Sequence, residues 1–166
     1  MNTRFTEVIC GPGQGKTAMA MGKCLQKAAQ GESVIVIQFL KGREEQATDI
    51  LEKLDSQDVK IFRFERMNKC YADLTDEEKN EERLNIRNGV NFARKVIATQ
   101  ECEVLVLDEI LGLLDNDILE EQTLREILQM RDPSIHIIMT GWRFPDSLRD
   151  CVDSITTVTT EDKTTR

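Results

Sequence analysis

Residues 5–17 read FTEVICGPGQGKT, and the fold of the whole chain can be worked out from this stretch. Its apolar, β-branched first half predicts a strand over 5–10. The glycines that follow allow backbone N–H groups to turn inward around phosphate oxygens. Lys16 supplies a positive charge for the outer phosphates, and the Thr17 hydroxyl can bind Mg²⁺. We expect a helix over 17–30, whose positive N-terminal end adds to an anion site.

The loop departs at one position from the full phosphate-loop pattern, G-x-x-x-x-G-K-[ST], because Cys10 stands where the first glycine belongs. The strand before it and the Ala/Met/Leu-rich run after it supply the context that the motif requires. The alternative is a glycine turn that has lost its nucleotide, which leaves Lys16 and Thr17 in register unexplained. We therefore predict nucleotide contacts from Gly11, Pro12, Gly13, Gln14, Gly15, Lys16, Thr17 and Ala18.

The composition is that of an ordinary globular protein. The chain has 166 residues, of which 40% are hydrophobic and 31% are charged, so we expect one domain over 1–166. A net charge of −8 argues against a nucleic-acid partner. No apolar run approaches about 18 residues, so we expect no membrane partner, and residues 1–5 lack the apolar stretch of a signal peptide. The five scattered cysteines favour reduced thiols and a cytoplasmic location. His136, the only histidine, lies in an apolar run that favours a structural role.

Strand and helix patterns alternate along the rest of the chain. Strands are expected over 33–39, 59–64, 104–107, 135–140 and 154–158, and helices over 43–54, from a capping box at 75–78 to about 97, over 117–130 and near 146–151. This alternation predicts an α/β fold of the P-loop NTPase (RecA-like) type, with a mostly parallel sheet and helices on both faces. In such folds the ligand lies at the carboxyl ends of the strands. The phosphate loop, 108–109 and 140–141 all follow strand ends, so we expect them to converge.

Asp108 and Glu109 follow the apolar strand as the second acidic motif of phosphate-loop proteins does. A carboxylate there can hold Mg²⁺ directly or through water, so the predicted metal ligands are Thr17, Asp108 and Glu109. We expect Glu109 nearest the metal and Asp108 fixing Thr17 or a water. The alternative is that one carboxylate only caps the next turn. The predicted catalytic residues are Lys16, Thr17 and Glu109. Glu109 could also position a water for hydrolysis. Nothing else in the sequence indicates hydrolysis.

Four segments resemble the phosphate-loop type of ATP:corrinoid adenosyltransferase. Residues 11–17 are similar to its loop G-N-G-K-G-K-T, which also lacks the first glycine. Residues 36–42 resemble V-V-Q-F-I-K-G, and residues 106–110 resemble V-L-D-E-[IL]. Residues 139–153 resemble I-x-T-G-R-x-x-P-x-x-L-x-x-x-A-D. The Q-F-x-K-G block is the most specific of these, because generic ATPases lack it. The resemblance implies that Gln38 and Lys41 also belong to the nucleotide site.

The resemblance implies an unusual reaction. Co(I) of a reduced corrinoid attacks the 5′ carbon of ATP, triphosphate leaves intact, and a cobalt–carbon bond forms. ATP and Mg²⁺ are then the expected cofactors, with a corrinoid such as cob(I)alamin or cob(I)yrinic acid a,c-diamide as co-substrate. The family also suggests a homodimer and a flavoprotein reductant as partners. Two alternatives stay open: a phosphate-loop ATPase or small-molecule kinase, and a non-catalytic ATP-binding module.

The chain departs from the family on the corrinoid side. Relatives carry an aromatic pair like G-F-T-W after the third strand, whereas residues 66–73 here read RMNKCYAD, with one aromatic residue. The family arginine after T-G is Trp142 here, and an arginine follows at 143. The family's C-terminal K-H-x-[FY] segment is also absent. The expected corrinoid contacts are therefore Tyr71, Trp142 and Arg143.

Overall fold

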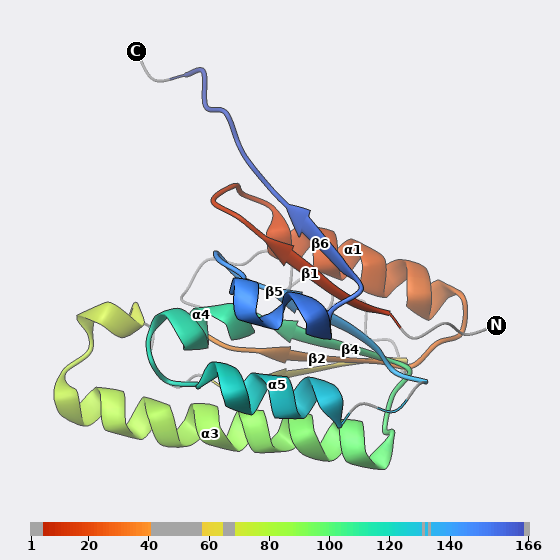
Figure 1. The fold of residues 1–166 in the computed structure, drawn as a ribbon, viewed down its shortest axis with the longest axis horizontal. Helices are drawn as coiled ribbons and strands as arrows, with labels where there is room; N and C mark the ends of the chain where they lie inside the picture. The colour runs from red at the N-terminus through yellow and green to blue at the C-terminus, as the bar shows by residue number, and fades with distance from the viewer. Residues whose placement is uncertain (1–4, 41–57, 65–68, 131, 133, 165–166) are drawn as a thin grey trace.

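Six parallel strands form one sheet within the part of the chain that the computed structural model describes, namely residues 5–40, 58–64, 69–130, 132 and 134–164 (Figure 1). The strands are β1 (Thr6–Cys10), β2 (Val34–Gln38), β3 (Val59–Arg63), β4 (Val104–Asp108), β5 (His136–Thr140) and β6 (Ser154–Thr157), in the order β3-β2-β4-β5-β1-β6. Every residue of β1, β2 and β4 is buried, as expected for parallel strands covered on both faces. The predicted strands and their parallel pairing are confirmed.

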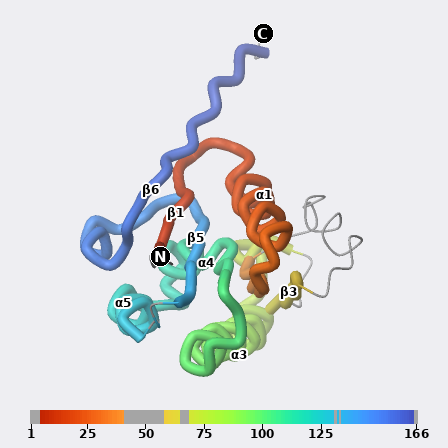
Figure 2. The backbone as a smooth tube through the Cα atoms, turned by 90° about the vertical axis from the view of Figure 1, so that its right-hand side faces the viewer, coloured from red at the N-terminus to blue at the C-terminus, as the bar shows by residue number. Residues whose placement is uncertain are grey.

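Helices cover both faces of this sheet. They are α1 (Lys16–Ala29), α3 (Asp76–Thr99), α4 (Ile110–Asp115) and α5 (Glu121–Gln129), with short 3₁₀ helices η1 (Tyr71–Asp73) and η2 (Asp146–Cys151). Figure 2 shows α1 on one side of the strands, and α3 and α5 on the other. Alternation along β2 matches this division, because Val34 and Val36 pack with α1 whereas Ile35 and Ile37 pack with α3 to α5. None of the described helices has the length and apolar character that a membrane span requires.

The capping box predicted for α3 is present at its N-terminus. The Thr75 hydroxyl accepts a hydrogen bond from the Glu78 N–H at 3.2 Å, and the Glu78 carboxylate accepts one from the Thr75 N–H at 2.8 Å. The predicted apolar face of α3 is buried against the sheet through Ile86, Val90, Ala93 and Ile97. Because α3 leads from the end of β3 to the start of β4, its first turns lie at the carboxyl edge of the sheet.

One predicted helix is wrong in its extent. The sequence pattern indicated a helix over 117–130, but the structure has α4 at 110–115 and α5 at 121–129, with a turn between them. Asp117 adopts a left-handed φ of 54°, and the N–H groups of Ile118 and Leu119 both donate to the Leu113 carbonyl. These bonds end α4 and hold 117–120 out of a helix. The helix predicted over 43–54 lies outside the described residues.

The strand order brings the chemically interesting residues together at one edge. β2, β4, β5 and β1 are consecutive neighbours in the sheet. The register places Gln38 beside Asp108 at the ends of β2 and β4, and Ile9 beside Thr140 at the ends of β1 and β5. The predicted convergence of the phosphate loop, 108–109 and 140–141 therefore follows from the topology.

Candidate nucleotide-binding site

The phosphate loop joins β1 to α1 and passes close to the C-terminal segment of the chain. An added Cβ at Gly11 would lie 2.5 Å from the Val158 carbonyl oxygen, and one at Gly13 would lie 2.7 Å from the same atom. Gly11 also has a φ of 114°, which L side chains rarely adopt. Glycine is therefore required at both positions by this packing, whether or not a nucleotide is bound.

The Lys16 side chain folds back into the loop. Its ammonium group donates to the Gly11 carbonyl at 2.8 Å and to the Gly13 carbonyl at 2.6 Å. It also lies 5.8 Å from the centroid of the Trp142 ring, within the range of a cation–π contact. The positive charge predicted for the phosphate site is thus positioned at the loop, held by carbonyl oxygens that a phosphate oxygen could replace.

Asp108 is the centre of a buried hydrogen-bond network. Its side chain, which is fully buried, accepts from the Thr17 hydroxyl at 3.0 Å and from the Thr140 hydroxyl at 2.6 Å. The Gln38 amide donates to its second oxygen at 3.1 Å. The Thr17 hydroxyl donates its proton to Asp108, and a hydroxyl oxygen in this role can also serve as a cation ligand. The predicted contact between Asp108 and Thr17 is present.

The network continues from Gln38 to the edge of the sheet. The Gln38 carbonyl oxygen accepts from Nε of Arg63 at 3.0 Å, while its amide nitrogen donates to Asp108. The Gln38 side chain is 1% exposed, so its amide is held between two charged groups. This arrangement supports a positioning role for Gln38 beneath the nucleotide site. Lys41, the other residue suggested by the Q-F-x-K-G block, lies outside the described residues.

Glu109 has a constrained backbone. Its φ of 62° is left-handed, and its N–H donates to the Thr140 hydroxyl at 2.8 Å. Its carboxylate makes no capping hydrogen bond to α4, although Glu109 is the residue that begins this helix. The capping alternative for Glu109 is therefore not supported. Non-glycine residues in this conformation cost about 1 kcal/mol or more and are concentrated at functional sites.

The sequence analysis placed 140–141 at the site without giving Thr140 a role, and it missed the C-terminal segment. Thr140 joins Asp108 to the Glu109 backbone, and the T-G pair at the end of a buried strand was the signal that could have identified it. The Gly13 N–H donates to the Val158 carbonyl at 2.8 Å, and the Gln14 N–H donates to the Thr160 hydroxyl at 2.9 Å. No sequence motif marks this contact, which Figure 1 shows as the chain leaving β6 beside the loop.

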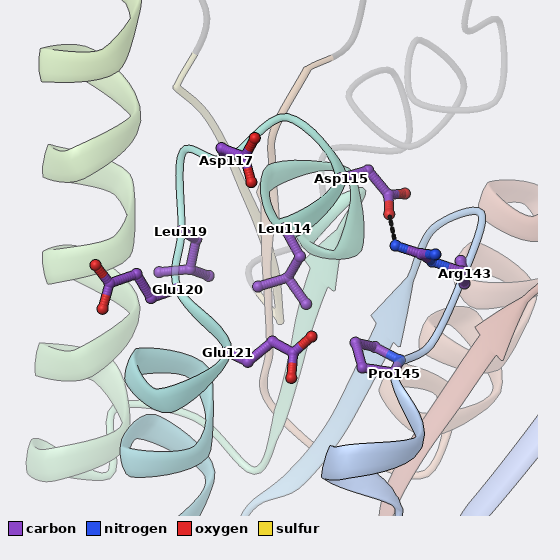
Figure 3. Close-up of a pocket in the computed structure, with 8 residues that line it drawn as sticks. All are labelled: Leu114, Asp115, Asp117, Leu119, Glu120, Glu121, Arg143 and Pro145. Carbon is purple, nitrogen blue, oxygen red and sulfur yellow. Dashed lines mark hydrogen bonds and ion pairs between the residues drawn. The ribbon is translucent and has the colours of Figure 1, made fainter.

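The three residues predicted to contact the corrinoid lie in different places. Trp142 is 61% exposed, and its carbonyl accepts from the Gly11 N–H at 2.8 Å, so its indole stands beside the phosphate loop. Arg143 instead lines a cavity of about 390 Å³ together with Asp115, to which it is joined at 3.5 Å (Figure 3). Tyr71 packs on α3, where its hydroxyl accepts from Nε of Arg83 at 2.7 Å.

His136 has structural contacts at the opposite end of β5. Its Nε2 lies 2.9 Å from a Glu7 carboxylate oxygen, and its ring meets Phe5 edge-on. Burial alone would raise the pKa of Glu7, but hydrogen bonds from His136 and Lys23 outweigh burial and lower it. These groups bridge β5, β1 and α1, and the predicted structural role of His136 agrees with their geometry.

The fold has a match among solved structures. A solved KaiC-like protein, PH0186 from Pyrococcus horikoshii OT3, matches with a TM-score of 0.52 and 20% identity, over 86% of this chain and 62% of that one. This likeness confirms the predicted α/β fold of the RecA-like type.

The chain belongs to the ATP:corrinoid adenosyltransferase BtuR/CobO/CobP family, because the sequence model of that family matches residues 2–165. An uncharacterized protein of Nostoc sp., all2391, is 23% identical over an alignment of 142 residues that covers 81% of this chain. The chain spans 38% of the length of that relative. The family is described as one of ATP:corrinoid adenosyltransferases.

Proposed function

We propose that the chain transfers the 5′-deoxyadenosyl group of ATP to Co(I) of a reduced corrinoid and releases triphosphate, in the biosynthesis or salvage of cobalamin. The observation that carries the proposal is the hydrogen bond from Thr17 of the phosphate loop to the buried Asp108, in a chain that the family model matches over residues 2–165. The reaction balances without a protein base. A cobalt–carbon bond forms, the C5′–oxygen bond breaks, and the electron pair leaves on triphosphate.

The residues of the loop would bind and stabilise the leaving group. Lys16 would exchange its bonds to Gly11 and Gly13 for bonds to phosphate oxygens. Backbone N–H groups at the start of α1 would add donors that need no reorganisation during the reaction. Since Co(I) is itself a strong nucleophile, the main contributions of the protein would be positioning of the two substrates and stabilisation of the charge on triphosphate.

Mg²⁺ fits the donor set at this site. Thr17, Asp108 and Glu109 offer oxygen ligands, which this hard cation prefers, and the Thr17 hydroxyl oxygen is oriented with its proton away from the loop. The ion would supply positive charge to the triphosphate oxygens. Asp108 would act through Thr17 or a bound water, and Glu109 would lie nearest the metal, with Thr140 holding both residues in place.

Trp142 is the best-placed of the three candidates for the corrinoid. Its exposed indole lies next to Lys16, so a flat apolar group above the nucleotide could stack on it. Arg143 and Tyr71 are engaged elsewhere, and any contact they make would involve the periphery of the corrinoid. We further propose one domain, a cytoplasmic location, a homodimer and a flavoprotein reductant.

The variant Lys16→Ala tests the phosphate-loop part of the proposal. Two charge-assisted hydrogen bonds to phosphate contribute on the order of 3 kcal/mol, so ATP affinity should fall by about 100-fold. Lys95→Ala is the matched control, because Lys95 is exposed on α3 and pairs only at 3.4 Å with Glu101. Equal ATP affinity in the two variants, measured by calorimetry, would show that Lys16 does not bind the phosphates of ATP.

A further inference from the structure

A second cavity lies away from the phosphate loop, between α3 and the turn that joins α4 to α5. Its volume is about 500 Å³, and its polar lining includes Arg83, Arg87, Asn91, Arg94 and Thr123. Asp117 and Glu120 line the opposite wall. Figure 3 shows this turn passing alongside α3, with Glu120 directed towards the helix. Neither the proposed transfer reaction nor the nucleotide site uses these groups.

The three arginines share one face of α3. Their spacings of four and seven residues place them one above the next along the helix. Clustering of three guanidinium groups is unexpected in a chain with a net charge of −8, where arginine would ordinarily be neutralised by a nearby carboxylate. The cavity lining carries three positive and two negative side chains, so it is locally positive.

These arginines are incompletely satisfied by the described protein groups. Nε of Arg83 donates to the Tyr71 hydroxyl at 2.7 Å, and the two terminal nitrogens of Arg83 take no part in this bond. Arg87 and Arg94 form no hydrogen bond or ion pair among the described residues, and Nε of Arg94 is buried without a partner. Arg87 is exposed and Arg94 is half-buried, and both line the cavity, so guanidinium nitrogens of both can donate to a ligand there.

We propose that this cavity binds a small phosphate- or carboxylate-bearing molecule, which accepts hydrogen bonds from Arg87 and from the terminal guanidinium nitrogens of Arg94. Planar guanidinium groups match the oxygens of both anions. The Asn91 amide and Thr123 hydroxyl supply further polar contacts, and Asp117 and Glu120 can accept from donor groups on the ligand. Because the two carboxylates offset most of the positive charge, the cavity should prefer a ligand of low charge to triphosphate. The proposal does not depend on the transfer reaction.

Arginine Nε–H signals of the ¹⁵N-labelled full chain provide a direct test. The probes are inorganic phosphate and, in a separate titration, acetate. We expect saturable shifts of the Arg87 and Arg94 signals with at least one probe, and the more effective probe identifies the class of anion. Arg149, whose Nε already donates to Asp146 at 2.8 Å, should not shift. Repeating the titration in Lys16→Ala separates this site from the phosphate loop, because the arginine shifts should persist there.

The variant Arg87→Gln makes the test quantitative. Arg87 is exposed at the cavity mouth, so its replacement should leave folding intact. The affinity for the effective probe should fall at least about tenfold, as followed by the Arg94 signal, and Arg149→Gln should leave it unchanged. Absence of a saturable shift with either probe would overturn the proposal. So would an Arg87→Gln protein that binds the probe as tightly as the parent.

Discussion

Replacement of Thr140 by valine probes the network that organises the site. Valine has nearly the same shape as threonine but lacks the hydroxyl. The change removes the 2.6 Å bond to Asp108 and the acceptor for the Glu109 N–H at 2.8 Å. Thr140 is fully buried, so water cannot replace either bond. A bond to a charged group contributes about 1.5–3 kcal/mol and a neutral one about 1 kcal/mol, so the free energy of unfolding should fall by about 2–4 kcal/mol.

Urea unfolding of Thr140→Val and Thr140→Ser measures this effect. Serine keeps the hydroxyl and loses one buried methyl group, so its expected loss is only about 1 kcal/mol. ATP affinity should fall in the valine variant and be largely retained in the serine variant, because only valine frees Asp108 and Glu109. Equal stabilities for the two variants would refute the reasoning, since the methyl group, and not the hydroxyl, would then be what matters.

Three further predictions concern other parts of the molecule. Thr160→Val removes the acceptor for the Gln14 N–H and leaves this amide for phosphate, so ATP affinity should rise about fivefold. Unchanged affinity would show that the bond between Gln14 and Thr160 does not compete with ATP. Thiol labelling of the native protein should modify the exposed Cys70 rapidly and spare Cys24, because burial raises the pKa of the Cys24 thiol to about 12. Labelling of both cysteines at similar rates would contradict the burial of Cys24. Glu7→Gln should be less stable than the parent near neutral pH, with a difference that shrinks below about pH 4. The folded-state pKa of Glu7 is lowered, so its contribution is present above the unfolded pKa and is lost as pH falls through the folded one; a difference independent of pH would contradict it.

Much of the fold could be predicted because its strands are buried on both faces. Runs such as 34–37 and 104–107 are apolar throughout, and their shortness and richness in β-branched residues are typical of strands buried on both faces. The α3 capping box was also readable, because its two hydrogen bonds depend on residues only three positions apart. Features of this kind can be predicted because they depend on residues that are close together in the sequence.

The features that were missed depend on contacts distant in sequence. Residues 110–115 read ILGLLD, which has no polar stripe to mark α4 as a helix, because this helix is buried almost completely. The hydrogen bond from the Gln14 N–H to the Thr160 hydroxyl spans 146 positions, and nothing in the local sequence encodes it. Thr140 was recognised as part of a motif, but its role as the link between Asp108 and Glu109 follows only from the strand order.

The most direct test of the proposed function is an anaerobic assay of the full chain with MgATP and chemically reduced cob(I)alamin, which follows the corrinoid spectrum and identifies the phosphate product. The account predicts a light-sensitive alkylcobalt spectrum together with release of intact triphosphate. A second acceptor, cob(I)yrinic acid a,c-diamide, shows which corrinoid is preferred. Formation of ADP or orthophosphate with both corrinoids unchanged would contradict the account and indicate a phosphate-loop ATPase or kinase instead.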